Sequence, residues 1–401
     1  MPQTRTWRLR WAGGLTAVTT AAVLSAITLP AHAAAPQGRI QGAGDPGSVG
    51  GSYIVTLKGG TKAPSAAGRK VAEEYGAKIS HTYGTALNGF AVRADETRAR
   101  RLAADSRVAS VVQDTAVGLD SRRQNPPPWG LDRIDRPDLP LDHGYTSPPP
   151  AGAGVTAYVI DTGVRITHRD FGGRASYGWD FVGNDGTAED GNGHGTHVAA
   201  TLAGTGYGVA RKTDVVAVRV LDDAGDGTTA QVIAGIDWVT EHARKPAVAN
   251  LSVGGYANAQ LDAAVRNSIA SGVTYAVAAG NDAVPASLYS PARVKEALTV
   301  GATDQADARA GFSNYGARLD LFAPGVAITS ASSLSDTGTA TFSGTSMASP
   351  HVAGAAALYL AGHRKASPAQ VSRALVRQAA AGKVTRAGPG SPNRLLQVNS
   401  P

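Results

Sequence analysis

The second half of the chain alternates short apolar runs with segments of helical spacing. Five runs are almost continuously apolar, at 155–160, 214–220, 247–252, 273–279 and 297–300. Such runs are typical of strands in a parallel sheet that is covered on both faces. Segments 229–242 and 260–271 lie between these runs and have the apolar spacing of helices. The alternation predicts a doubly wound, mostly parallel α/β fold, in which chemistry collects at the carboxyl ends of the strands.

A smaller unit with a different order of elements precedes this domain. Its expected elements are a strand at 52–58, a helix at 65–75, a hairpin at 81–92 around Asn88-Gly89, a helix at 98–105 and a strand at 108–112. The order β-α-β-β-α-β predicts a small α+β domain of ferredoxin-like fold. We place this domain at 52–121, after a Gly-rich linker at 34–51 and before the large domain at 122–401. Residues 122–128 are polar and Pro-rich, which favours an exposed, cleavable junction.

The first 33 residues have the pattern of a signal peptide. Arg5, Arg8 and Arg10 precede an apolar run at 14–29, and Ala31-His32-Ala33 follows it. The alternative is a membrane anchor, but a spanning helix needs about 20 apolar residues, and this run is interrupted by Thr and ended by Pro. We therefore expect cleavage after residue 33, export, and no membrane attachment of the mature chain.

The charge distribution and the absence of cysteine exclude some classes of function for this chain. Residues 1–121 carry 14 Lys and Arg against 8 Asp and Glu, whereas residues 122–401 carry 24 against 23. The net charge of +7 therefore lies mostly in segments expected to be removed, which argues against a nucleic-acid partner. The chain has no cysteine, so an exported form must resist unfolding without disulfides, through packing or binding of hard cations.

Three segments carry residues suited to nucleophilic catalysis. Asp161 directly follows the apolar run at 155–160, His194 lies in the glycine-rich segment Asp190-Gly-Asn-Gly-His194-Gly-Thr-His197, and Ser346 lies in Gly344-Thr-Ser346-Met-Ala at the expected start of a helix. A serine becomes a nucleophile when a histidine takes its proton and a carboxylate orients that histidine. There are alternatives for two of these segments. The Asp-Thr-Gly sequence is also typical of turns. His194 and His197 are three positions apart and could bind a metal, although no H-E-x-x-H pattern accompanies them.

A fourth segment supplies a donor for a developing oxyanion. Asn281 follows the apolar run at 273–279, and a helix starting near Ser346 would direct the Ser346 N–H to the same place. The residues occur in the order Asp, His, Ser, which differs from α/β-hydrolases and from chymotrypsin-like enzymes.

These four segments resemble the signature blocks of the subtilisin family. The similarity extends over about residues 126 to 396 and is strongest to the proteinase K branch, particularly aqualysin-like enzymes. That branch is indicated by Trp129-Gly-Leu-Asp-Arg-Ile-Asp135, Ala234-Gly-Ile-Asp-Trp238 and Ser391-Pro-Asn-Arg-Leu395. Residues 52–115 resemble the inhibitor propeptide of the same family. The resemblance implies Asp161, His194 and Ser346 as the triad, with Asn281 and the Ser346 N–H as the oxyanion hole.

The family also implies how a peptide substrate binds. Its backbone would add as a strand between two enzyme segments, which here are Gly225-Asp226-Gly227 and Ser252-Val253-Gly254. The S1 pocket would have Ser252–Gly254 as one wall and Ala278, Ala279 and Gly280 as the other. These walls are small and uncharged, so we expect an apolar or aromatic P1 residue. Asp226 beside the S4 subsite would favour a cationic P4 residue, or would simply be a solvated turn residue.

The resemblance further implies a structural calcium ion. Its ligands would be the Asp320 carboxylate and the carbonyls of Lys295 and Ala297, an oxygen set suited to Ca²⁺. The alternative for Asp320 is a surface carboxylate that closes a turn. Many relatives of the branch carry disulfides, which this chain lacks.

The sequence therefore predicts a secreted, monomeric serine endopeptidase of broad specificity, made as a zymogen that its own propeptide inhibits and that cuts itself near residues 121–124. Its partners would be protein and peptide substrates. A selective processing protease would need acidic residues in S1. A catalytically inactive binding module of the same fold is the alternative from another class.

Overall fold

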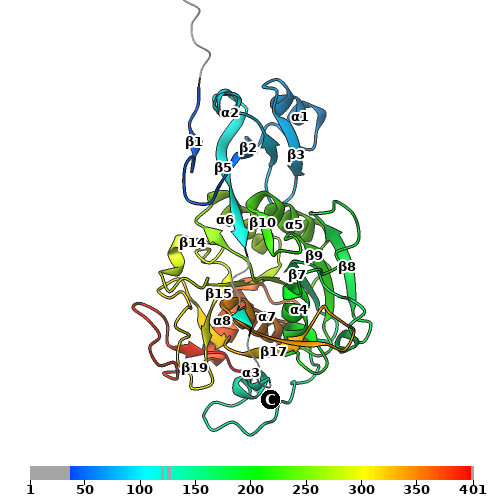
Figure 1. Cartoon of the computed structure of the whole chain (residues 1–401), viewed down its shortest axis with the longest axis vertical. Coiled ribbons are helices and arrows are strands. Elements are labelled where there is room, and N and C mark those ends of the chain that lie inside the picture. Colours follow the sequence, from blue (N-terminus) through cyan, green and yellow to red (C-terminus); the bar gives the residue numbers. More distant parts are fainter. Residues whose placement is uncertain (1–36, 119–121, 124–127, 399–401) are drawn as a thin grey trace, which may run out of the picture. The chain divides into compact units, whose positions relative to one another are not determined.

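The computed structural model describes residues 37–118, 122–123 and 128–398, with the side chains of 118 and 122–123 left out. The expected signal peptide and most of the expected cleavage region lie outside the described residues. These described residues belong to one compact unit (Figure 1).

The N-terminal domain is built on an antiparallel sheet. Its strands and helices are β1 (Ile40–Gln41), β2 (Ser48–Leu57), α1 (Ala66–Glu73), β3 (Lys78–Tyr83), β4 (Gly89–Arg93), α2 (Glu96–Ala103) and β5 (Val108–Gly118). The strand order β5-β2-β4-β3 is the ferredoxin-like order. Ser65 caps α1 and Asp95 caps α2 through their side chains, which explains where these helices begin.

The expected linker at 34–51 is not featureless. Its described part contains β1, which pairs in parallel with β5, and the first four residues of β2. Ile40 is buried against this sheet. The glycines interrupt the apolar and polar alternation by which strands are predicted. Strand β1 forms because the edge of β5 is available for pairing, which local sequence does not show.

The large domain is a doubly wound α/β fold with a nine-stranded sheet. The strand order is β19-β20-β16-β15-β13-β11-β7-β9-β8, and every neighbouring pair except β19 with β20 is parallel. The sheet strands are β7 (Thr156–Asp161), β8 (Ala175–Asp180), β9 (Asp214–Arg219), β11 (Ala247–Leu251), β13 (Thr274–Ala278), β15 (Leu298–Thr303), β16 (Leu321–Pro324), β19 (Ala380–Ala381) and β20 (Arg394–Leu395). The five apolar runs predicted as strands are β7, β9, β11, β13 and β15.

Short strands and helices complete the domain. The remaining strands are β6 (Arg122–Arg123), β10 (Asp226–Thr228), β12 (Gly255–Tyr256), β14 (Tyr289–Ser290), β17 (Ile328–Ala331) and β18 (Thr339–Ser343). The helices are α3 (Trp129–Ile134), η1 (Arg169–Phe171), α4 (His194–Ala203), α5 (Thr229–His242), α6 (Ala259–Ala270), η2 (Ala286–Leu288), α7 (Thr345–Gly362) and α8 (Pro368–Gln378). Helix α5 has the bounds that its apolar spacing predicted, and a capping box of Thr228 and Gln231 fixes its start.

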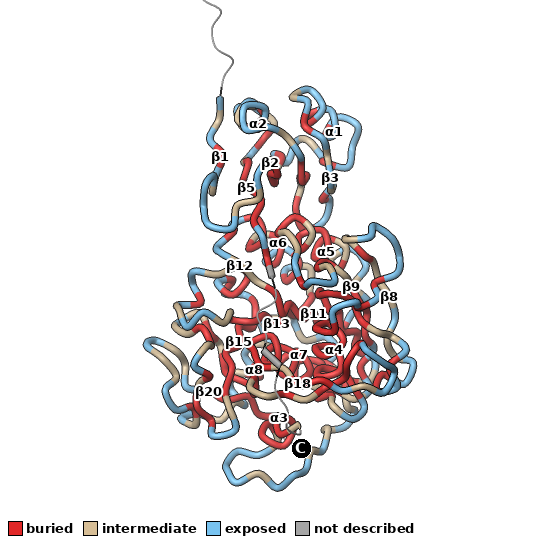
Figure 2. The backbone as a smooth tube through the Cα atoms, in the orientation of Figure 1, coloured by how far each residue is buried: buried red, intermediate tan, exposed pale blue. Residues whose placement is uncertain are grey.

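Two apolar layers cover the faces of the large sheet, and Figure 2 shows this buried interior in red. One layer packs α4 and α7 against the sheet, and the other packs α5 and α6 against the opposite face. The second layer also contains Ile54, Tyr83 and Leu87 of the N-terminal domain. The N-terminal domain therefore buries apolar side chains on α5 and α6.

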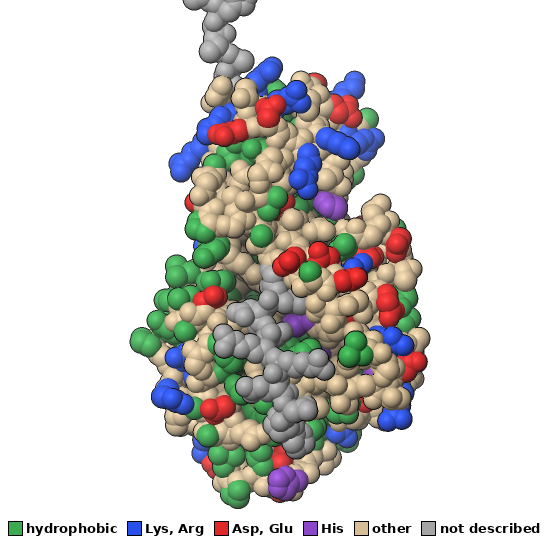
Figure 3. Space-filling model, viewed as in Figure 1, with side chains coloured by type: hydrophobic (Ala, Val, Ile, Leu, Met, Phe, Trp, Pro, Cys, Tyr) green, Lys and Arg blue, Asp and Glu red, His purple; other side chains and the backbone are tan. Residues whose placement is uncertain are grey.

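Two further expectations concern the surface of the molecule. Lys and Arg side chains gather over the outer end of the N-terminal domain, which agrees with its excess of basic residues (Figure 3). Among the described residues, no helix is both long and apolar enough to cross a membrane.

Candidate active site

The strand ends and helix starts bring together the residues singled out in the sequence. Asp161 is the last residue of β7, His194 is the first residue of α4, and Ser346 is the second residue of α7. Strand β11, which pairs with β7, leads directly into Ser252. The chain reverses its winding direction between β7 and β11, so the carboxyl ends of these strands border the crevice where ligands bind in such folds.

Asp161 and His194 form a buried pair. His194 Nδ1 lies 2.7 Å from Asp161 Oδ1, which also accepts the Thr162 N–H at 2.8 Å. Both residues are at most 1% exposed. Within the described part of the chain, His194 Nε2 has no hydrogen-bond partner. A bond from Nδ1–H to the carboxylate fixes the tautomer in which Nε2 can accept a proton.

Ser346 lies at the start of α7, where a proline shapes the helix. Pro350 cannot supply the N–H that would normally bond to the Ser346 carbonyl four residues earlier. The Ser252 hydroxyl donates to this carbonyl instead, at 2.7 Å. The Ser346 hydroxyl in turn donates to the Ser252 carbonyl at 3.0 Å. These two bonds join the nucleophile candidate to the end of β11, and no sequence pattern indicated them.

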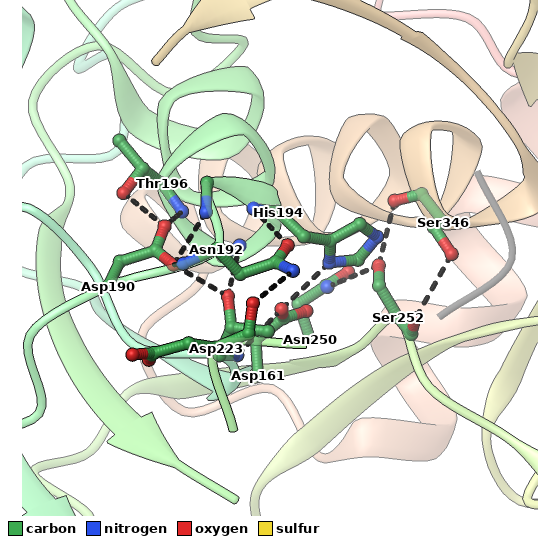
Figure 4. Close-up of polar contacts among 12 residues, drawn as sticks. Asp161, Asp190, Asn192, His194, Thr196, Asp223, Asn250, Ser252 and Ser346 are labelled. Atoms are coloured by element: carbon green, nitrogen blue, oxygen red, sulfur yellow. Dashed lines mark hydrogen bonds and ion pairs between the residues drawn. The ribbon is translucent and has the colours of Figure 1, made fainter. Parts of the chain in front are cut away.

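A polar network behind Ser252 holds this junction. Asn250 donates from its amide to the Ser252 hydroxyl at 2.8 Å and accepts from the Ser349 hydroxyl at 2.8 Å. All three side chains are at most 2% exposed, and buried polar groups that are fully paired make a region rigid. Figure 4 shows the ring of His194 lying between Asp161 and Ser346, with Asn250 and Ser252 beside them.

Asp190 fixes the loop that carries His194. Its Oδ1 accepts from Gly193 N at 2.8 Å and from the Thr162 hydroxyl at 2.8 Å, and its Oδ2 accepts from Thr196 N at 2.8 Å. Asp190 therefore joins the segment after β7 to the first turn of α4 (Figure 4). Gly193 has a positive φ of 104°, a conformation that glycine adopts without strain.

The second histidine of this segment has a different environment. His197 Nε2 lies 2.9 Å from the Ile328 carbonyl, and burial lowers the pKa of His197 to about 3, so its ring is neutral. Among the described residues, no group of three or more His, Asp or Glu side chains could hold a metal ion. His197 therefore packs as a buried neutral side chain, and the structure does not support the reading of His194 and His197 as metal ligands.

Asn281 borders the same crevice as Ser346. The side-chain carbonyl of Asn281 accepts from the Thr345 N–H at 2.8 Å and from the Thr345 hydroxyl at 2.9 Å. Because the carbonyl oxygen is held by Thr345, the orientation of the amide is fixed. Asn281 and Ser346 both line a small cavity of about 60 Å³.

The walls of this cavity are the residues expected in S1. Ser252, Val253, Gly254, Ala278, Ala279 and Gly280 line it. Asp282, Tyr289, Ser290 and Ala292 also line it and had not been anticipated. Asp282 is an exposed carboxylate, whereas Ala292 and Ser290 are buried, so the buried lining carries no charge.

The expected substrate edge is paired with the end of the N-terminal domain. In β10, Asp226 and Gly227 pair antiparallel with Gly118 and Val117 of β5. Gly225 precedes this strand in a turn with a φ of 86°. A Cβ on Gly255 would lie 2.9 Å from the Ala116 carbonyl, so β5 runs close to the segment after Gly254 as well.

The chain continues on the other side of the crevice. Strand β6 pairs antiparallel with β18, with Arg123 opposite Phe342 and Arg122 opposite Ser343. Ser343 lies three residues before Ser346. The end of β5 therefore pairs with β10 on one side of the candidate site, and β6 pairs with β18 on the other side.

Asp320 is a partly buried carboxylate whose desolvation outweighs the attraction of nearby Arg394. Burial raises the pKa of Asp320 to about 6, and its Oδ2 accepts one hydrogen bond, from Thr299 N at 2.8 Å. Lys295 is exposed and Ala297 is 1% exposed in the segment before β15. A partly buried carboxylate with this electrostatic cost fits a cation ligand.

Comparisons with known proteins agree with this architecture. A family model described as "Subtilase family" matches residues 152–396. The chain belongs to the subtilase family. A second model, "Peptidase inhibitor I9", matches residues 52–120 of this subtilase, so its N-terminal domain is of the inhibitor type.

Relatives and a solved structure extend the comparison. The extracellular serine proteinase of Thermus sp. (strain Rt41A) is 53% identical over 321 residues, which are 80% of this chain and 78% of the relative. Alkaline serine exoprotease A of Vibrio alginolyticus is 48% identical over 80% of this chain and 60% of the relative. The crystal structure of a cold adapted subtilisin-like serine proteinase is 51% identical with a TM-score of 0.66, over 68% of this chain and 98% of that chain. This subtilase is thus an extracellular serine proteinase, and the inactive binding module is not favoured.

Proposed function

We propose that this subtilase is an endopeptidase in which Ser346 attacks the scissile carbonyl, His194 is the general base and Asp161 orients the base. The observation that carries the proposal is the buried 2.7 Å contact between His194 Nδ1 and Asp161 Oδ1, beside a serine at a helix start. The Ser346 hydroxyl leaves the Ser252 carbonyl and gives its proton to His194 Nε2. His194 then passes this proton to the leaving amine, while Asp161 stabilises the imidazolium.

The oxyanion is stabilised by donors from two segments. Asn281 supplies its side-chain amide and Ser346 its backbone N–H, which is free because it lies in the first turn of α7. In subtilisin, the loss of one such side-chain donor costs about 10²–10³ in kcat. We expect a loss of that order in Asn281→Ala, with KM little changed.

Labelling of Ser346 tests the assignment directly. A fluorophosphonate probe reacts with a serine only when that serine is activated as a nucleophile. We expect labelling of the mature enzyme at Ser346, no labelling of Ser346→Ala, and strongly reduced labelling of His194→Ala. Equal labelling of the wild type and His194→Ala would refute the role of His194 as base.

The cavity supports an apolar P1 preference. Its buried lining is uncharged, and Asp282, the charged residue among the described lining, is exposed. A buried Lys or Arg side chain would therefore lack a carboxylate partner. We expect apolar and aromatic P1 residues to dominate a peptide-library profile. Dominant Arg or Lys at P1 would refute this pocket assignment.

The N-terminal domain serves as inhibitor and as the first substrate. The pairing of β5 with β10 has the form of substrate-strand addition, and β6 occupies the opposite side of the crevice. We infer that the enzyme cuts its own chain near residues 121–124, after the segment that pairs with β10. Ser346→Ala should then be exported at the size of the unprocessed chain, and its normal maturation in a protease-deficient host would contradict self-processing.

Calcium would stabilise the mature fold. The Asp320 carboxylate and the Lys295 and Ala297 carbonyls would hold the ion, which adds a crosslink to a chain without cysteine. Without a cation, the raised pKa of Asp320 means that its ionisation weakens the fold as the pH rises from about 4 through about 6. We expect a chelator to shorten the half-life at high temperature more at pH 8 than at pH 5, and Asp320→Asn to remove this difference. Equal half-lives with and without chelator at pH 8 would exclude the site.

A further inference from the structure

A basic cleft lies between the end of α7 and helix α8, away from the catalytic residues. It has a volume of about 740 Å³, and its charged and titratable lining consists of His363, Arg364, Lys365, Arg373 and Arg377, which we call the basic cleft residues. All five are exposed. Among the described residues that line the cleft, none is Asp or Glu.

The Arg and Lys side chains of the cleft are not neutralised by carboxylates of the described chain. Elsewhere, arginines such as Arg165, Arg219 and Arg293 form ion pairs with carboxylates. In the part of the chain that the structure describes, none of the four Arg and Lys residues of the cleft has an ion-pair partner. Residues 122–401 carry nearly equal numbers of basic and acidic residues, so this concentration of charge is local.

Local structure holds the cleft residues in place. Ser367 and Gln370 form a capping box and Pro368 opens α8, which fixes the turn between the two helices. Arg373 and Arg377 lie four residues apart and therefore share one face of α8. The end of the Arg364 side chain lies against the Gly154 backbone, since a Cβ at Gly154 would lie 2.5 Å from Arg364 Nη1.

Helix electrostatics alone do not account for this arrangement. Cations near the end of α7 complement the helix dipole, which explains Arg364 and Lys365. Arg373, however, lies in the middle of α8, and its position four residues before Arg377 places like charges together at a cost to the helix. A ligand with several negative charges would offset this cost.

We propose that the basic cleft binds a linear polyanion that presents phosphate groups along its length. Guanidinium groups form bidentate hydrogen bonds with phosphate oxygens, and several cations along one cleft can bind successive phosphates of one chain. None of the large exposed apolar residues of the described chain lines the cleft, which argues against insertion into a lipid surface. Among the described lining residues, Tyr359 stacks on His363 at 4.1 Å between ring centroids, so one face of each ring is already covered and less ring surface remains for a nucleic-acid base.

The position of the cleft allows binding and proteolysis together. Helix α7 has 18 residues, so its two ends lie roughly 25 Å apart. Ser346 is at one end and the basic cleft is at the other. A polyanion held in the cleft would therefore tether active enzyme to a phosphate-rich surface without entering the catalytic crevice.

The test compares two double variants of equal net charge. Arg373→Glu/Arg377→Glu alters the cleft, and Arg169→Glu/Arg244→Glu alters two exposed arginines on other parts of the domain that have no ion-pair partner in the described chain. The mature enzyme is blocked at Ser346 with a fluorophosphonate after maturation, and its retention on immobilised long-chain polyphosphate is measured between about 50 and 300 mM salt. Peptide hydrolysis and thermal unfolding of both variants check that the fold is intact.

We expect the cleft variant to bind at least tenfold more weakly at about 0.15 M salt. The magnitude of its slope of log affinity against log salt should fall by about 1.4–1.8, because each of the two lost phosphate contacts contributes roughly 0.7–0.9. The control variant should bind like the wild type, and both should hydrolyse peptide normally. Equal losses in both variants, or no binding of the wild type, would overturn the proposal. Tighter binding to heparin or to duplex DNA than to polyphosphate would overturn the ligand class.

Discussion

The contact between Asp237 and the propeptide allows a quantitative prediction about inhibition. Asp237 lies in the third turn of α5, and its carboxylate accepts three backbone N–H bonds from residues 84–86. The bond from Gly84 N is 3.0 Å and that from Thr85 N is 2.8 Å, and Ala86 N makes the third. The propeptide chain turns here between β3 and β4, so three donors point to one carboxylate.

The magnitude follows from which donors can return to water. Gly84 and Thr85 are exposed in the complex, so their N–H groups find water when the carboxylate is removed. The Ala86 N–H is buried, and an unpaired buried donor costs about 1–3 kcal/mol. We therefore expect Asp237→Ala to weaken propeptide binding by about 2 kcal/mol, which is about 30-fold in the inhibition constant.

The assay uses mature enzyme with the propeptide supplied in trans. Inhibition constants are measured for wild type, Asp237→Ala, Asp237→Asn and the control Glu241→Ala, which removes an exposed carboxylate from the last turn of the same helix. Asp237→Asn retains one acceptor oxygen and should lie between wild type and Asp237→Ala. Alanine favours helix, so the mature fold and the hydrolysis of small peptides should be unchanged. An inhibition constant within twofold of wild type in Asp237→Ala, with normal peptide hydrolysis, would refute this reasoning.

Three further predictions address the catalytic network, pH and the N-terminal strands. Ser252→Ala removes the donor to the Ser346 carbonyl, and we expect kcat to fall several-fold while KM is nearly constant; an unchanged kcat would show that α7 holds Ser346 without this bond. Burial of His81 against Phe181 lowers the pKa of His81, so its neutral form favours the complex, and inhibition should weaken as the pH falls through about 6.5 and below. The inhibition profile of His81→Gln should be flatter over pH 7.5 to 5.5, and an identical profile would contradict this. Deletion of residues 37–46 removes β1 from the edge of β5 and should speed propeptide release after the first cut, whereas an unchanged time course of activation would exclude that role.

Much of the fold could be predicted because its strand and helix signals are local. Apolar runs show strands with two covered faces, and the capping residues of α5 mark its start, so its bounds agree with the prediction. The ferredoxin-like order of the small domain could also be predicted, from the alternation of apolar and polar residues in its strands and from its turn residues. The strands β8 and β16 were not predicted, since β8 is mostly half-buried and has no continuous apolar run, and β16 is only four residues long.

The sequence by itself determined the element on which each candidate catalytic residue lies, because Asp161, His194 and Ser346 adjoin a strand end or a helix start that local patterns reveal. Only the tertiary structure decided what these residues contact. The bond between Ser252 and the Ser346 carbonyl joins residues 94 positions apart, and the Asp237 carboxylate meets donors about 150 positions earlier in the chain. Such partners depend on which strands are neighbours and on how the propeptide docks. The physical reason is that local spacing fixes the backbone of each segment, whereas hydrogen-bond partners and the charge around a cleft arise only when distant segments pack together.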